Sequence, residues 1–200
     1  LSAQLRAADG ASEDYFGESV SISGDVAVVG AYGDRHAGFR SGSAYLFTRS
    51  EDGTWPQTAK LTAADAGGIA DFGKTVSISG DTVIVGAALA TNTFDYEGSI
   101  YIFTRAADGS WPQTTKLTAS NPTRNSAFGL SVAISGDTAL VGRNVVDQVR
   151  SITTGLIHVY NRAADGNWHH TTQFAAADVV EDDEFATQVA LSGDTALILS

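Results

Sequence analysis

The chain repeats itself with a period of about 56 residues. The pair Phe-Gly occurs at 16–17, 72–73 and 128–129, spaced 56 apart, and Phe185-Ala186 follows 57 residues later. The tripeptide Ser-Gly-Asp and a tryptophan recur with nearly the same step. Because three independent markers share one period, the chain is a tandem repeat, in which each unit must bury its apolar faces against its neighbours.

Each repeat predicts four short strands. Branched and aromatic residues alternate with polar ones, and Gly-Asp or Asp-Gly pairs separate the runs as in tight hairpins. In the first repeat the runs are 19–23, 26–31, 43–49 and the segment after Trp55. The second run, VAVVGA, is almost wholly apolar, which predicts burial on both faces. Four antiparallel strands at a period of about 50 residues are typical of one blade of a β-propeller.

The sequence therefore predicts an all-β chain that forms a single propeller segment. Residues 1–8 would end a preceding blade, and the blades that follow are expected at 9–64 (blade 1), 65–120 (blade 2), 121–177 (blade 3) and 178–200 (first half of blade 4). About 3.5 blades are too few for a closed ring. We expect the remainder of the propeller, or a partner chain, to complete it. The recurring phenylalanine would fill the gap between blades, and its glycine would let the backbones approach closely.

Phe-Gly, an apolar strand and Val-Gly-Ala at 29–31 and 85–87 together resemble the FG-GAP repeats of integrin-α-type propellers, most closely the bacterial branch of that family. The resemblance covers residues 5–200 and weakens in the fourth copy, where Ala186 replaces the glycine and Leu199-Ser200 stand in place of Gly-Ala. It implies a seven-bladed ring, an extracellular or cell-surface location, and a role in recognition or adhesion. Integrin-type repeats hold calcium in the hairpin between their first two strands. Here that hairpin is Ser-Gly-Asp, and its one carboxylate is too few for calcium.

Composition and motifs exclude several classes of function. The chain has 12 Lys and Arg against 23 Asp and Glu, and its net charge of −11 opposes binding to nucleic acid or anionic lipid. No apolar run approaches the roughly 20 residues that cross a bilayer, so we expect no membrane insertion. The sequence contains no nucleophile elbow, zinc-binding His-Glu-x-x-His or phosphate-binding glycine loop. We therefore expect a protein that is not an enzyme.

Two kinds of loop differ in every copy: the leading loops, which precede the first strand of each blade, and the middle loops, which join its second and third strands. Successive turns alternate between the two ends of the strands, so both kinds are expected on one face, called the loop face here. Its aromatic, amide and guanidinium groups suit a protein or carbohydrate ligand. The candidate ligand-binding residues are Tyr32, Asp34, Arg35 and His36 in blade 1, Phe94, Asp95 and Tyr96 in blade 2, and Arg143, Asn144 and Arg150 in blade 3.

The leading loops are acidic, with carboxylates at Asp9, Glu13, Asp14, Asp65, Asp71, Asp178, Glu181, Asp182, Asp183 and Glu184. Clustered carboxylates could hold calcium, above all at Asp182 and Glu184. The alternative is a solvated acidic loop, and we assign no metal or cofactor site. Adjacent His169 and His170 would point to opposite faces of a strand and could not share one ion. His158 stands where the other blades have tyrosine.

These observations favour an extracellular recognition module that binds a protein or glycan through the loop face. An alternative is a structural subunit that assembles through exposed blade edges, because the final run at 196–199 is apolar and would lie at an edge. A third reading is a hydrolase acting on a polysaccharide or ester, through a site assembled across blades.

Overall fold

The computed structural model describes residues 3–93, 95–147, 152–177 and 185–199. In this part of the chain the strands form three four-stranded antiparallel sheets and one two-stranded sheet. The described residues include no helix long and apolar enough to cross a membrane. The predicted all-β fold, built of propeller blades, is confirmed.

Each blade is a simple antiparallel meander. Blade 1 contains β1 (Val20–Ser23), β2 (Val26–Ala31), β3 (Ser43–Thr48) and β4 (Gln57–Leu61). Blade 2 contains β5 (Thr75–Ser79), β6 (Thr82–Ala87), β7 (Ser99–Thr104) and β8 (Gln113–Leu117). Blade 3 contains β9 (Ser131–Ser135), β10 (Thr138–Asp147), β11 (Ile152–Arg162) and β12 (Trp168–Phe174). The two strands of blade 4 are β13 (Gln188–Ser192) and β14 (Thr195–Leu199).

The hairpins close with the turn chemistry that the sequence predicts. Ser23 pairs with Val26, so Gly24 and Asp25 form a two-residue turn. Only Gly24 has a positive φ, at 58°, which is the pattern of a type II′ turn with glycine in its first central position. The turn between β3 and β4 contains Asp52-Gly53. There the Asp52 carboxylate accepts hydrogen bonds from both the backbone amide and the hydroxyl of Thr54. These turns lie at the end of the blades opposite the loop face.

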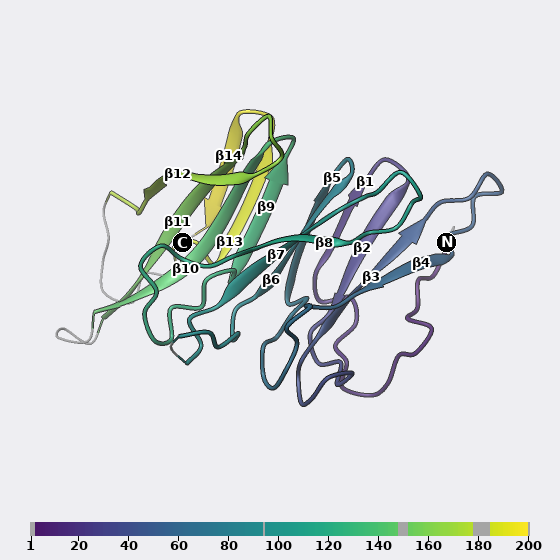
Figure 1. Ribbon diagram of the computed structural model, residues 1–200, viewed down its shortest axis with the longest axis horizontal. Helices are drawn as coiled ribbons and strands as arrows, with labels where there is room; N and C mark the ends of the chain where they lie inside the picture. Colours follow the sequence, from purple (N-terminus) through teal and green to yellow (C-terminus); the bar gives the residue numbers. More distant parts are fainter. Residues whose placement is uncertain (1–2, 94, 148–151, 178–184, 200) are drawn as a thin grey trace.

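The blades stack face to face, and Figure 1 shows their sheets side by side with the two chain termini on opposite sides of the molecule. Strands β2 and β6 are buried along their whole length, as predicted. Val76 and Ile78 on β5 are 6% and 5% exposed because they pack against blade 1. Their counterparts on β1, Val20 and Ile22, are 65% and 62% exposed. The difference arises because, in the part of the chain that the structure describes, no blade lies beside β1.

The Phe-Gly pair forms the joint between blades. Phe72 is fully buried, and its ring packs edge-on against Tyr101 at a centroid distance of 5.3 Å. The following residue, Gly73, has a φ of 90°, and its carbonyl lies so close to Gly30 of blade 1 that a Cβ at Gly30 would stand 1.9 Å from the oxygen. Both predicted roles of the pair, filling the gap and close backbone approach, are confirmed.

A second feature of the joint is a ladder of serine hydroxyls. Ser19, Ser21 and Ser23 of blade 1 accept hydrogen bonds from the backbone N–H groups of Val76, Ile78 and Gly80, at 2.9, 3.2 and 3.0 Å. The same contact recurs one blade later, from Ile134 N to Ser77 and from Gly136 N to Ser79. Between blades 3 and 4 it recurs from Gly193 N to Ser135. The alternating serines therefore connect the first strands of successive blades.

Blade 3 departs from the expected pattern. Residues 143–147 were expected in a middle loop, but they continue β10, which pairs with β11 as far as Asp147 and Ile152. The run from Arg143 to Asp147 keeps strand geometry because Asn144, Val145 and Val146 find antiparallel partners on β11. Blade 3 therefore presents a long hairpin where blades 1 and 2 present an irregular loop.

Candidate functional site

The leading and middle loops lie together, as predicted. Backbone bridges join Gly42 to Phe72 and Gly98 to Phe128, which connects the middle loop of each blade to the leading loop of the next. The amide of Asp71 donates to the carbonyl of Arg40 at 3.1 Å. In the described part of the chain, the loop face consists of leading loops 9–15, 62–71 and 118–127 and of middle loops 32–42, 88–93 and 95–98. In Figure 1 the two middle loops lie at the lower edge of the molecule.

Tyr32 lies beneath the surface of this face. Tyr15 stacks on its ring with centroids 4.7 Å apart and an interplanar angle of 9°. The Arg40 guanidinium and the Lys74 ammonium each lie 5.1 Å from the Tyr32 ring centroid. Tyr32 is buried, whereas Tyr15 is 52% exposed. The accessible aromatic surface of this cluster is therefore Tyr15, which sequence reasoning did not select.

Arg40 is held by a buried carboxylate. Its guanidinium lies 2.6 Å from Asp71, which is almost completely buried. Burial raises the pKa of Asp71 in spite of the neighbouring Arg40. The pair joins the middle loop of blade 1 to the leading loop of blade 2. Its role is to fix the two loops against each other, which keeps the cluster around Tyr32 in place.

Asp34 is the centre of a polar network below the middle loop of blade 1. Its carboxylate accepts hydrogen bonds from Ser43 Oγ at 2.7 Å and Tyr45 Oη at 3.1 Å, and Lys60 Nζ lies 2.6 Å away. Burial opposes the charge, but the hydrogen bonds from Lys60 and Ser43 bring the pKa of Asp34 down to about 2. Lys60 also contacts Asp9 at 2.5 Å. Asp34 therefore fixes the middle loop of blade 1 to the strands β3 and β4 beneath it.

His36 lies at the edge of this network. Its Nδ1 atom is 3.3 Å from Ser41 Oγ and 3.4 Å from Ser43 Oγ, and burial lowers the pKa of the imidazole. In a hydrolytic triad the carboxylate orients the histidine and the histidine contacts the serine. Here the carboxylate side chain of Asp34 bonds to Ser43, which is completely buried. Asp34, His36 and Ser43 do not have the arrangement of a triad.

Arg35 and Phe39 form the outer part of the same loop. The Arg35 guanidinium lies 5.0 Å from the centroid of the Phe39 ring and 2.6 Å from the Glu13 carboxylate. Phe39 is 54% exposed, and the Arg35 side chain is also solvent-accessible. The two residues present a cation and an aromatic face together, which is a common combination in binding surfaces.

In blade 2 different ion pairs and hydrogen bonds hold the loops of the loop face. Asp95 forms an ion pair with Arg124 at 3.0 Å, and Tyr96, with a φ of 55°, is 40% exposed. Lys116 occupies the place of Lys60 and contacts Asp65 and Asn92. Phe94, a candidate from the sequence, lies outside the described residues.

Two of the three candidates in blade 3, Arg143 and Asn144, lie on β10 and not in an irregular loop. Arg143 is buried within β10, and its guanidinium donates to the carbonyl of Asn121 at 2.9 Å. Asn144 follows it on β10, and its amide donates to the carbonyl of Ser126. Arg150 lies outside the described residues. Arg143 holds the leading loop of its own blade and offers no accessible guanidinium to a ligand.

The acidic residues of the described leading loops have protein partners. Asp9 and Asp65 contact Lys60 and Lys116, and the Asp14 carboxylate accepts a hydrogen bond from the amide of Ala11. Among the described residues, no group of three or more acidic or histidine side chains could hold a metal ion. Asp178 and the acidic run 181–184, where calcium was considered, lie outside the described residues.

A model of the FG-GAP repeat matches the chain at residues 1–47, 55–103 and 111–160, together more than half of its length. A search of curated proteins finds no match. Each matched segment ends within the third strand of a blade, at β3, β7 and β11. The matched unit thus runs from the outer strand of one blade to the third strand of the next, and it includes the Phe-Gly joint. The chain belongs to the FG-GAP repeat family.

Proposed function

We propose that the chain is an extracellular or cell-surface recognition module that binds a protein or glycan through the loop face. FG-GAP repeats occur in adhesion and recognition modules and are generally extracellular. The observation that carries the proposal is the distribution of exposed large apolar side chains, most of them aromatic. Among the described residues, the exposed large apolar side chains of the loop face are Tyr15, Phe39, Ile69 and Tyr96.

The loop face has the physical properties of a binding surface. Its rings stand on a rigid base, because Tyr15 is stacked on buried Tyr32 and the loop below is held by Asp34. Loops on a rigid scaffold are the usual place for binding residues. An exposed tyrosine or phenylalanine face supports stacking on a sugar ring or an apolar protein side chain. Arg35 adds a directional hydrogen-bond donor beside Phe39.

The test is a comparison of two variants on a glycan microarray and a panel of purified extracellular proteins. One variant replaces the rings of the loop face (Tyr15→Ala, Phe39→Ala and Tyr96→Ala), and the control removes apolar groups elsewhere (Val20→Ala and Ile22→Ala). We expect the first variant to weaken binding at least about tenfold with an unchanged melting temperature. The control should bind like the original chain. Equal binding by both variants would overturn the proposal.

A second function, assembly through blade edges, is favoured by a different observation. Leu197 and Leu199 on β14 are exposed, and among the described residues β14 has a strand on one side only, β13. Such an apolar edge can accept a strand from another chain. Light scattering on Leu197→Lys tests this function, because an assembly that uses β14 should dissociate. An unchanged assembly state would remove the second function and leave the loop-face proposal untouched.

A further inference from the structure

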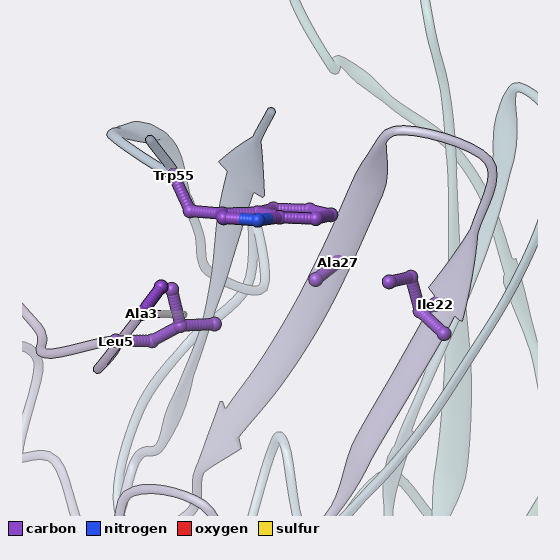
Figure 2. Close-up of a pocket in the computed structure, with 5 residues that line it drawn as sticks. All are labelled: Ala3, Leu5, Ile22, Ala27 and Trp55. Carbon is purple, nitrogen blue, oxygen red and sulfur yellow. The ribbon is translucent and has the colours of Figure 1, made fainter. Parts of the chain in front are cut away.

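Blade 1 has a face without a neighbouring blade in the described structure. The face contains exposed Val20 and Ile22, and beside them is an open hollow of about 190 Å³ lined by Ala3, Leu5, Ile22, Ala27 and Trp55. Figure 2 shows the flat side of the Trp55 indole above this space, with Ile22 and Ala27 on one side and Leu5 on the other.

The corresponding face of blade 2 is covered by a neighbouring blade. Val76, Ile78 and Trp111 are buried there, in one core cluster with Val28 and Leu46 of blade 1. The face of blade 3 is covered in the same way by blade 2. The open face of blade 1 repeats these residue types at the same positions, so it continues an interface that is already present twice in the chain.

Residues 3–8 occupy part of the place that a preceding blade would fill. Leu5 and Ala7 pack in the cluster of Phe16 and Trp55, just as Leu61 and Ala63 of blade 1 pack in the cluster of Phe72 and Trp111. The amide of Ala8 donates to Gln57 Oε1 at 2.9 Å, and the amide of Ala64 donates to Gln113 Oε1 at the same distance. Residues 3–8 thus lie where the outer strand of a preceding blade belongs, and they fix where that blade must sit.

The remaining strands of that blade need a particular chemistry. By the register of β1 with β2, the N–H groups of Val20 and Ile22 point toward the open side. Their counterparts Val76 and Ile78 donate to serine hydroxyls there. Gly30, Gly86 and Gly142 each face a backbone carbonyl of the next blade, and an added Cβ would lie 1.9, 2.3 and 2.5 Å from its oxygen. Gly17 occupies the facing position in blade 1, so a docked blade needs a glycine opposite it.

Blade 4 of a second copy lacks this chemistry. In blade 3, Ser131 of the first strand pairs with Gly142 of the second. In blade 4 the equivalent pair is Gln188 and Leu199, so Leu199 takes the position of Gly142. Gln188 and Ala190 likewise stand at the positions of Ser19 and Ser21. A leucine side chain cannot share the space of a backbone carbonyl, and this clash is the main obstacle. Gln188 and Ala190 add to it by placing no hydroxyl under the facing N–H groups, a loss that the joint of blades 3 and 4 tolerates at Ala133 alone.

We propose that the open face of blade 1 docks a complete FG-GAP blade with serines on its first strand and glycine on its second, and that blade 4 of another copy cannot take this place. The face of blade 1 then discriminates between blades: it accepts a standard blade beside β1 and does not accept blade 4 of another copy. This proposal is independent of any ligand on the loop face.

The test adds one blade before residue 1 of the chain. A second copy of residues 9–56 is placed directly before residue 1, so that residues 3–8 close the added blade as its outer strand. In the control extension, three positions of the added copy are changed to the residues that blade 4 has there: Ser19→Gln, Ser21→Ala and Gly30→Leu. Amide hydrogen exchange is then followed at Val20 and Ile22 of the original blade 1, with Val76 and Ile78 as an internal measure of folding.

We expect the unsubstituted extension to slow exchange at Val20 and Ile22 by about tenfold or more, toward the rates of Val76 and Ile78. The control extension should leave them as fast as in the unextended chain. Equal protection by both extensions, or none by the unsubstituted one in a folded chain, would overturn the proposal. So would a dimer of the unextended chain in light scattering that already protects Val20 and Ile22, because a second copy would then fill the face.

Discussion

The Nδ1 atom of His158 lies 3.0 Å from the Nε2 atom of His170, and the His158 side chain is only 1% exposed. His158 takes the place of Tyr45 and Tyr101 in the repeat, and Phe128 packs edge-on against its ring. Burial, together with Arg143 and His170 nearby, lowers the pKa of His158 to about 4. In the described structure its Nε2 atom has no hydrogen-bond partner. Blade 3 therefore contains a buried imidazole that must stay neutral.

This histidine predicts a loss of stability in mild acid. The unfolded chain binds a proton at His158 near pH 6.5, whereas the folded chain does so only near pH 4. The free energy of unfolding should therefore fall as the pH drops below about 6.5, by about 2 kcal/mol between pH 7 and 5. Urea unfolding at both pH values measures this loss.

The matched variant is His158→Tyr, which restores the residue of the other two blades. Because tyrosine does not titrate in this range, the variant should lose the part of the difference between pH 7 and 5 that His158 contributes. His36, whose pKa is also lowered by burial, is the same in both chains. Asp34 does not affect this comparison of the two chains. Its pKa is lowered from 3.8 to about 2, so the stability that its charge contributes is lost only below about pH 4. An identical pH dependence in both chains would contradict the role of His158.

Gly30→Ala should destabilise the joint between blades 1 and 2. Its new Cβ would stand 1.9 Å from the carbonyl oxygen of Gly73, so the two backbones must separate. We expect a loss of about 1–3 kcal/mol in the free energy of unfolding. Gly67→Ala is the control, because a Cβ there meets nothing within 4 Å. Denaturant midpoints that shift equally in the two variants would refute this account of the joint.

The serine ladder predicts two opposite effects. Ser77→Ala removes the acceptor of the Ile134 amide and should cost about 1 kcal/mol. Blade 3 has Ala133 where blades 1 and 2 have Ser21 and Ser77, so Ala133→Ser should add an acceptor facing blade 4 and slow amide exchange in β13. Hydrogen exchange and urea unfolding measure the two changes. A neutral Ser77→Ala would show that the ladder contributes little.

Lys60→Met should destabilise blade 1 at neutral pH. The change leaves the buried carboxylate of Asp34 without its cation, at a cost of about 1–3 kcal/mol, between the values for surface and buried ion pairs. The control is Arg49→Met, because the Arg49–Asp25 pair is exposed and spans 3.8 Å. Thermal unfolding should distinguish the two variants clearly. A Lys60→Met chain as stable as Arg49→Met would mean that the Asp34 network does not support the loop.

The repeat made the fold predictable from the sequence, and particular side chains show where prediction stopped. Phe72 and Gly30 could be assigned to the joint because each recurs with the period of the repeat. Tyr15, Lys60 and Ser43 were missed because their importance depends on neighbours from other strands or loops: Tyr15 stacks on Tyr32, and Lys60 and Ser43 meet Asp34.

Among the candidates, Asp34, Arg35 and His36 do lie close together in blade 1, and Tyr96 is exposed. Tyr32 and Arg143 are buried, which their residue types alone could not indicate. The loop expected at 143–147 is strand, because pairing with β11 outweighs the polar character of Arg143 and Asn144. Burial and pairing of this kind depend on partners distant in sequence.

The ladder of serine hydroxyls has a consequence for how the chain folds. In the described residues the ladder partners lie 57 or 58 residues apart, so each of these joints connects blades that are adjacent in sequence. Folding can then begin at any pair of blades and spread in both directions, with each added blade contributing one more joint. The stability of a row of blades built this way grows with the number of its joints, and the weakest joint is the place where the row separates first.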